Sequence, residues 1–395
     1  MKKIKIGLSY ITGRAIFHRS LELIIKYFKK NNRKFDIEFS LFVFYDTKLN
    51  NLHPKTFKNI KNEIKNQFES IYFYNNENLI KEIRFVTGRD SEMERIGSDY
   101  AGKRNFIMYQ AIKNKIDYLI YIDDDEYPFQ IFNSKNSIFW KSQDIINARV
   151  DFLPASDITV GKRCGYLSPI PQVELNNLLT FDVWKDFLLS INSDILTKND
   201  IKEMFKNNGI TYCDDFENRE IFLDKNRCKF ITGGNLGINL TRLKKVNPFY
   251  NPYKARGEDS FLSTSLADSK VMSVVAYTFH DCFCLYDIDE NNLPQKLVPA
   301  PVNDLTVKRF YNACVGWIRY KPLFTYITNK TEYEIIIEST KKSLSDTLPT
   351  ICQYFNAPQF NDLLYELNVY DKNVVEQFEQ FERLKVNWKK LIGSI

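Results

Sequence analysis

Strand-like and helix-like stretches alternate along the first part of the chain. Short apolar runs rich in Ile, Tyr and Phe have the length and composition of buried strands. These runs are residues 3–10, 37–45, 71–74 and 118–122. Helical patterns fill the segments between them, at residues 16–29, 55–69 and 103–114. This alternation predicts a mostly parallel sheet with helices on both faces.

A charged segment, residues 171–227, interrupts the alternation. Strands are predicted on either side of it, at residues 151–160, 229–239 and 271–280. We interpret the segment as a helical insertion that shapes a binding site. Trp184 and Tyr212 within it are either stacking platforms or buried core aromatics.

The C-terminal part of the chain is predicted to be helical throughout. A Pro-rich link, LPQKLVPAPVND, marks its start, so we place one domain at residues 1–290 and a helical domain at 291–395. Apolar residues of the tail share one helix face, namely Val374, Phe378, Phe381, Leu384, Trp388 and Leu391. Such a stripe faces a core or a dimer partner. The alternative is contact with the inner face of a membrane, because Arg383, Lys385, Lys389 and Lys390 lie near the stripe.

Composition narrows the class of protein. The chain has 395 residues, of which 44% are hydrophobic and 26% charged, as in ordinary globular proteins. A net charge of +6 is too weak a bias to indicate nucleic-acid binding. Seven cysteines without a CxxC pair argue against a disulfide framework or a zinc site. With no signal peptide or membrane span in the pattern, we expect a cytoplasmic protein.

The segment YLIYIDDDEYP carries the strongest chemical signal. An apolar run ends in three adjacent carboxylates, Asp123, Asp124 and Asp125. Their repulsion calls for a cation, and oxygen ligands favour Mg²⁺ or Mn²⁺. Because ligands of open α/β sheets bind at the carboxyl ends of strands, we expect a metal ion at this edge. The alternative is an acidic turn that only caps the strand.

Three further motifs follow along the chain. Glycines in the GGN motif at 233–235 would let the backbone approach a ligand closely, or would form a β-bulge. The GED motif at 257–259 puts Asp259 at a helix start, where a carboxylate stays charged as a base or caps the helix. His280 ends the last predicted strand and is either a metal ligand or a satisfied strand-end histidine.

In order and spacing, residues 3–285 resemble a metal-dependent, nucleotide-sugar-using glycosyltransferase of the GT-A fold. The resemblance rests on the aspartate triplet, GGN, GED and the late histidine together. It implies that Asp125 and His280 ligate the metal, that Asp123 reaches the metal, ribose or donor sugar, and that Asp124 acts through water. Imidazole favours Mn²⁺ over Mg²⁺.

The same resemblance implies inverting chemistry at GED. Asp259 would be the base that deprotonates the acceptor hydroxyl, and Glu258 would bind acceptor hydroxyls. Gly233, Gly234 and Asn235 would contact the donor.

Further residues are implied to bind the nucleotide. Asp46, at the end of the second strand, resembles the acid that hydrogen-bonds the base, and Thr12 would line the same pocket. Lys103 and Arg104, near a helix start, resemble the basic pair beside base and diphosphate, the alternative being a solvated surface pair.

We therefore expect transfer of a sugar, from a UDP-sugar by preference, to a glycan or lipid-linked acceptor, in a bacterial surface-polysaccharide or lipooligosaccharide pathway. An inactive carbohydrate-binding scaffold is the first alternative. A sugar-1-phosphate nucleotidyltransferase is the second, but it would show a Gly-rich loop after the first strand, where SYITGRAIFH has one glycine. A haloacid-dehalogenase-type phosphatase would carry its Asp motif near the N-terminus.

Overall fold

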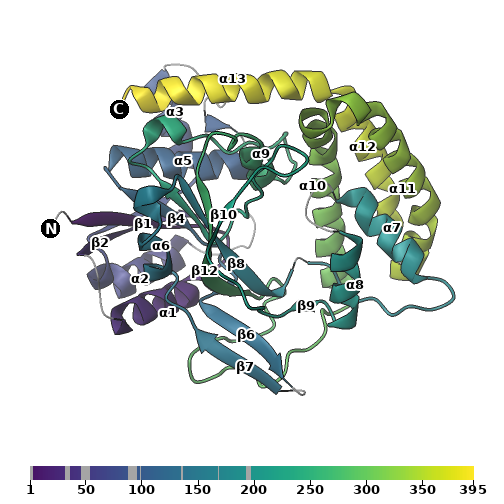
Figure 1. The fold of residues 1–395 in the computed structure, drawn as a ribbon, viewed down its shortest axis with the longest axis horizontal. Coiled ribbons are helices and arrows are strands. Elements are labelled where there is room, and N and C mark those ends of the chain that lie inside the picture. The colour runs from purple at the N-terminus through teal and green to yellow at the C-terminus, as the bar shows by residue number, and fades with distance from the viewer. Residues whose placement is uncertain are drawn as a thin grey trace.

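A mixed sheet with helices on both faces forms the first part of the computed structural model, and a helical region follows it (Figure 1). The structure describes residues 3–31, 36–45, 54–87, 96–97, 99–134, 137–167, 169–192 and 197–395. The fold class that the sequence predicted, α/β with a mostly parallel sheet and a helical C-terminal region, is confirmed.

Strand order follows from three parallel pairings in the N-terminal half of the sheet. The path is β10-β12-β8-β11-β4-β1-β2-β3, in which β3, β2, β1 and β4 run parallel. Antiparallel β11 lies between β4 and β8, and β12 is parallel to β8. The strands of this path are β1 (Ile4–Thr12), β2 (Ile37–Tyr45), β3 (Ser70–Tyr74), β4 (Tyr118–Tyr121), β8 (Ile158–Tyr166), β10 (Arg219–Ile221), β11 (Leu236–Asn239) and β12 (Val271–His280). Two short strands, β5 (Glu126–Tyr127) and β9 (Ile210–Thr211), pair with β12 and β8.

Two layers of helices cover the sheet, because alternate strand residues point to opposite faces. One layer contains α1 (Phe17–Lys30), α2 (Pro54–Ile64) and α6 (Asn147–Val150). The other contains α3 (Asn76–Thr87), α5 (Asp99–Lys113), α9 (Glu258–Thr264) and the end of α13 (Val374–Gly393). The central strands are therefore buried on both sides, as their apolar runs predicted.

The insertion and the C-terminal helices form one helical body. Here α7 (Phe181–Ile191) and α8 (Lys198–Lys206) share a core with α10 (Asp304–Thr328), α11 (Tyr333–Phe355) and α12 (Asp362–Lys372). Trp184 is 2% exposed, with its ring 5.7 Å from that of Phe310, so it is a core residue and not a stacking platform. The prediction that 171–227 is helical is wrong at its end, where β9 and β10 join the sheet.

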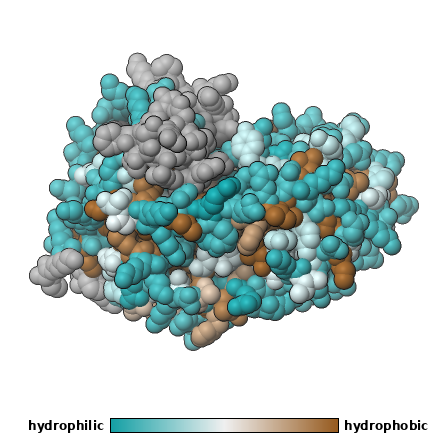
Figure 2. Space-filling model, turned by 90° about the horizontal axis from the view of Figure 1, so that it is seen from above, coloured by the Kyte–Doolittle hydropathy of each residue, from teal (hydrophilic) through white to brown (hydrophobic). Residues whose placement is uncertain are grey.

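The predicted tail stripe is buried within the chain. Helix α13 runs from the helical body back over the sheet domain (Figure 1). Trp388 is fully buried, and its indole N–H donates to the Val246 carbonyl over 3.1 Å. This stripe is therefore a core contact. Hydrophilic residues predominate on the side of the molecule that Figure 2 shows. No helix among the described residues is long and apolar enough to cross a bilayer.

Other departures from the prediction are local. Residues 151–157 are not a strand, because Pro154 lies in a 3-10 turn before β8. Only 236–239 of the predicted strand 229–239 is extended in the sheet. A hairpin of β6 (Phe129–Ser134) and β7 (Ser137–Ser142) was not predicted.

Candidate active site

Strand pairing brings the aspartate triplet and His280 together. The triplet follows β4, and the chain then turns into β5, which pairs with the end of β12 so that Glu126 lies opposite His280. The Asp281 amide donates to the Asp125 carbonyl over 2.9 Å. Two segments more than 150 residues apart in the chain thus meet at one edge of the sheet, as expected for a shared site.

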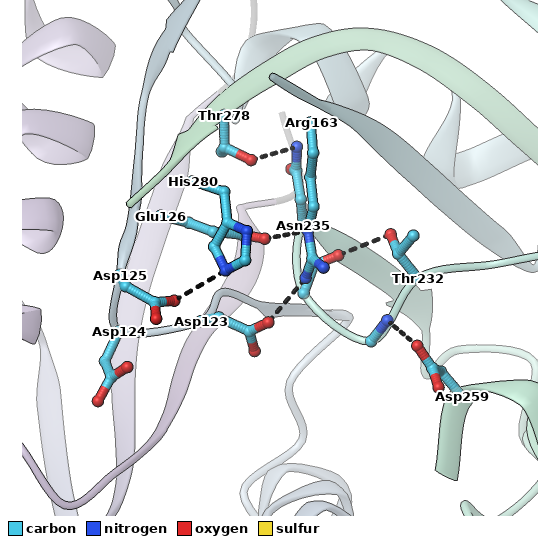
Figure 3. A network of polar contacts seen from close by, with 12 residues as sticks. Asp123, Asp124, Asp125, Glu126, Arg163, Thr232, Asn235, Asp259, Thr278 and His280 are labelled. Carbon is cyan, nitrogen blue, oxygen red and sulfur yellow. Dashed lines mark hydrogen bonds and ion pairs between the residues drawn. The ribbon is translucent and has the colours of Figure 1, made fainter. Parts of the chain in front are cut away.

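Asp125 and His280 face each other directly (Figure 3). His280 Nε2 lies 3.5 Å from Asp125 Oδ1, and His280 Nδ1–H donates to the Tyr166 carbonyl over 2.5 Å. Burial lowers the pKa of His280, but the Asp125 carboxylate outweighs it, so the pKa is raised overall. Burial works the other way at Asp125, where the charges of His280 and Arg14 still leave the pKa lowered.

Arg14 supplies a cation to the triplet. Its guanidinium forms ion pairs with Asp124 and, over 2.8 Å, with Asp125 Oδ2. Thr12, at the end of β1, donates its hydroxyl to Asp124 Oδ2 over 2.5 Å. Asp124 is 7% exposed, and burial raises its pKa despite these partners. The repulsion within the triplet is therefore relieved in part by the chain itself.

Arg163, on β8, holds a second pair of carboxylates (Figure 3). Its Nη2 donates to Asp123 Oδ2 over 2.7 Å, and its Nε pairs with Glu126. Glu126 is fully buried, which raises its pKa to about 7 although Arg163 opposes the shift.

Arg104 joins three segments from inside the domain. It is 3% exposed and donates to Glu258 Oε1 over 3.1 Å, to the Gly233 carbonyl over 2.8 Å and to Asp123 Oδ1 over 3.3 Å. Its guanidinium also lies 5.1 Å from the ring of Tyr121. Arg104 therefore connects these segments from the interior of the domain, whereas the Lys103 side chain is only partly buried.

The GGN segment shapes this network. A Cβ on Gly234 would lie 2.5 Å from Asp123 Oδ2, and one on Gly233 would lie 2.9 Å from Arg104 Nη2. The glycines thus give room to the arginine–aspartate pairs. Asn235 is fully buried and donates to the Ala276 carbonyl over 2.7 Å, so its side chain stabilises the sheet and does not reach the cleft.

Asp259 lies at the start of α9 and bridges to the GGN loop. Its Oδ2 accepts from the Gly233 amide over 2.8 Å, and its Oδ1 accepts from the Ser260 amide over 3.0 Å. The preceding Gly257 has φ 88°, a conformation that favours glycine, and the Tyr320 ring lies 2.9 Å from where its Cβ would be. Burial raises the pKa of Glu258, and the nearby Asp259 carboxylate raises it further.

Two adjoining cavities of about 530 and 580 Å³ expose these groups. The first is lined by Asp123, Asp124, Asp125, Asp259 and His280. The second is lined by Lys103, Arg104, Asp123, Gly233, Gly234, Glu258 and Asp259. Asp123 and Asp259 line both, so they lie where the two cavities meet. Of the remaining predicted residues, Thr12 reaches the site through Asp124, and Asp46 lies outside the described residues.

The predicted metal ligands fit a divalent ion in part. Asp125 and His280 offer an oxygen and a nitrogen that face one another, a donor pair suited to Mn²⁺. Asp123, the third predicted ligand, is engaged by Arg104 and Arg163. Within the described ranges, no three His, Cys, Asp or Glu side chains form a metal-binding group. Of the three predicted ligands, two therefore remain in a position to hold a metal ion, and any others would come from substrate or water.

Sequence reasoning missed the arginines of the first cavity. Arg14, Arg163, Arg256 and Arg309 all line the first cavity. One signal was available for Arg163, since VGKRCGY places two cations inside an otherwise apolar strand. Trp317, on α10, lines both cavities and carried no signal beyond its helical setting.

No family model and no curated protein matches the chain. Among solved structures, it is similar to S. aureus TarS 1–349, with 11% identity, 99% of this chain and 91% of that chain covered, and a TM-score of 0.39. The same protein in complex with UDP-GlcNAc gives 12% identity, the same coverage and a TM-score of 0.38. Mouse xyloside xylosyltransferase 1 gives 8% identity over 49% of this chain and 61% of that chain, with a TM-score of 0.23. At these TM-scores the likeness carries no argument.

Proposed function

We propose that the protein transfers a sugar from a nucleotide diphosphate, a UDP-sugar by preference, to a hydroxyl of a glycan or lipid-linked glycan. One observation supports this most strongly: Asp125, His280, Asp123 and Asp259 line a single cavity at the carboxyl ends of β4 and β12. Ligands of open α/β sheets bind at this edge. A bacterial surface-polysaccharide pathway is the setting we infer from the sequence resemblance.

The reaction has two charged centres, and the cleft has a group for each. The acceptor oxygen attacks the anomeric carbon, its proton passes to Asp259, and the bond from that carbon to the diphosphate oxygen breaks. The diphosphate leaves with the electron pair of that bond. Asp259 is held by the Gly233 and Ser260 amides, which fix its carboxylate at the meeting point of the two cavities.

A divalent ion, by preference Mn²⁺, is part of the proposal. Asp125 and His280 would hold it, and it would neutralise charge on the leaving diphosphate. The hydrogen bond from His280 Nδ1 to the Tyr166 carbonyl orients the ring so that Nε2 points toward Asp125.

The role of Asp259 is tested by Asp259→Asn. We expect transfer to fall about 10²- to 10⁴-fold, the usual contribution of a general base, with donor affinity unchanged. Thermal stability should fall only slightly, because the asparagine amide can accept from just one of the two backbone N–H groups. Asp268→Asn, which alters an exposed carboxylate away from the cavities, is the matched control. NMR of the product should show an inverted anomer, and a retained anomer would remove Asp259 as the base.

Binding of a nucleotide-sugar donor distinguishes the enzyme hypothesis from the scaffold hypothesis. A thermal-shift screen of nucleotide sugars with and without Mn²⁺ should show stabilisation by one donor, because a ligand that binds the native state raises apparent stability. Stabilisation by glycans alone, without a response to any nucleotide, would favour the inactive scaffold.

A further inference from the structure

Helix α10 forms a second wall of the cleft, contributed by the helical region. Arg309 and Trp317 on this helix line the first cavity together with Arg256. Gly316 makes room for Arg256, since a Cβ there would lie 2.6 Å from Arg256 Cγ, and the Arg256 amide donates to the Gly316 carbonyl over 3.1 Å. The wall facing the aspartates is therefore cationic and aromatic.

Arg309 and Arg256 differ from the other arginines that line the first cavity. Arg14 and Arg163 each pair with two carboxylates. Within the part of the chain that the structure describes, no side-chain hydrogen bond or ion pair engages the guanidinium of Arg309 or of Arg256. A cation that lines a cavity without a carboxylate partner is available to an anionic ligand.

The charge balance of the cleft calls for such cations. Its carboxylates outnumber the arginines that pair with them. The carboxylates that line the two cavities are Asp123, Asp124, Asp125, Glu258 and Asp259, and the arginines paired with them are Arg14, Arg104 and Arg163. A diphosphate entering this site would be repelled unless further positive charge faced it, supplied by the proposed divalent ion and by arginines without a carboxylate partner.

Arg309 lines the same cavity as Asp125 and His280, the groups near which the diphosphate is expected. Cys282 follows two residues after His280 and lines the same cavity. Arg256 contacts α10 at Gly316, two helical turns or about 10 Å from Arg309.

We propose that Arg309 of the helical region binds the phosphate groups of the nucleotide donor, opposite Asp125 and His280, and thereby stabilises the leaving diphosphate. This inference rests on the proposed function. It makes α10 part of the donor site, so that the helical region completes the site that the sheet domain begins. Arginine suits this task because its planar fork binds phosphate through two hydrogen bonds.

The test compares a diphosphate with its nucleoside. Wild-type protein is titrated calorimetrically with UDP, GDP, CDP, ADP and dTDP in Mn²⁺, and the tightest is carried forward with its parent nucleoside. In Arg309→Gln we expect the diphosphate to bind at least tenfold more weakly and the nucleoside to bind as before. Lys308→Gln, the same charge change on the neighbouring exposed residue, should leave both affinities within twofold.

Three outcomes would overturn the inference. The first is an unchanged diphosphate affinity in Arg309→Gln, and the second is an equal loss of nucleoside affinity in that variant. The third is an equal loss of diphosphate affinity in Arg256→Gln, which would indicate that the positive charge of the cleft as a whole, and not Arg309, attracts the diphosphate. If wild-type protein binds no nucleotide, the proposed function fails. Inorganic pyrophosphate then decides the inference: binding that Arg309→Gln weakens tenfold supports a phosphate site, and no such binding refutes it.

Discussion

Arg104 offers the sharpest test of how the site is held together. The sequence resemblance assigns it to the nucleotide, yet it is 3% exposed and is bonded to Glu258, Asp123 and the Gly233 carbonyl. If Arg104 acts mainly by holding these groups together, its removal should destabilise the fold and not only weaken the binding of the donor. Arg104→Met keeps most of the buried stem and removes the charge.

The expected cost follows from the partners left behind. Removing one member of a buried ion pair costs about 3–5 kcal/mol, because the remaining charge stays desolvated. Glu258, whose side chain is 12% exposed, would be left in that state, and the Gly233 carbonyl would lose its donor. We therefore expect Arg104→Met to lower the free energy of unfolding by about 3–5 kcal/mol.

Urea unfolding followed by tryptophan fluorescence measures this change. Lys103→Met is the matched control: the neighbouring residue is only partly buried and lines the second cavity, so we expect a loss below about 0.5 kcal/mol. The reasoning is refuted if Arg104→Met loses less than about 1 kcal/mol, or if both variants lose equally.

Three further predictions concern the glycine loop, the C-terminal helix and the metal. Gly234→Ala should destabilise the protein by about 1–3 kcal/mol and abolish transfer, because the new Cβ would lie 2.5 Å from Asp123 Oδ2. Gly393→Ala is the control in thermal unfolding, since no neighbouring atom lies within 4 Å of the Cβ it would add. Unchanged stability of Gly234→Ala would contradict the packing argument. Trp388→Ala should lower the free energy of unfolding in urea by about 3–5 kcal/mol and make α13 accessible to limited proteolysis. Val386→Ala, at a 54% exposed position, should do neither. Equal resistance of α13 to proteolysis in both variants would show that Trp388 does not anchor this helix. EDTA should abolish transfer and Mn²⁺ should restore it. Asp125→Ala should lose activity while its circular dichroism spectrum stays unchanged. Full transfer in EDTA would show that the arginines alone neutralise the charge of the diphosphate.

Much of the sheet domain could be predicted because its signals are local. The apolar runs of β1, β2, β3 and β4 and the helical spacing between them depend on neighbours within a few residues. A buried run that stops at three aspartates indicates a strand end with a charged edge, and His280 ends β12 as its pattern indicated. These signals can be recognised in one sequence alone, since each depends on backbone periodicity and burial.

The composition of the site was harder to predict. The carboxylates were found, because like charges in sequence are conspicuous. Of their arginine partners, the sequence indicated Arg104 but not Arg14 or Arg163, since Arg14 is 110 positions from Asp124 and Arg163 is 40 positions from Asp123. The triplet taken alone predicts a metal ion as its counter-charge, whereas the folded chain also supplies guanidinium groups.

The sequence by itself determined the strand and helix segments, the acidic edge of the sheet and the candidate base at a helix start. Only the tertiary structure decided which cations face those acids, that α7 and α8 pack with the C-terminal helices, and that α10 and α13 return to the sheet domain. The physical reason is range. Periodicity and capping act over a few residues, whereas ion pairing and core packing depend on strand order and on contacts between segments far apart in the chain.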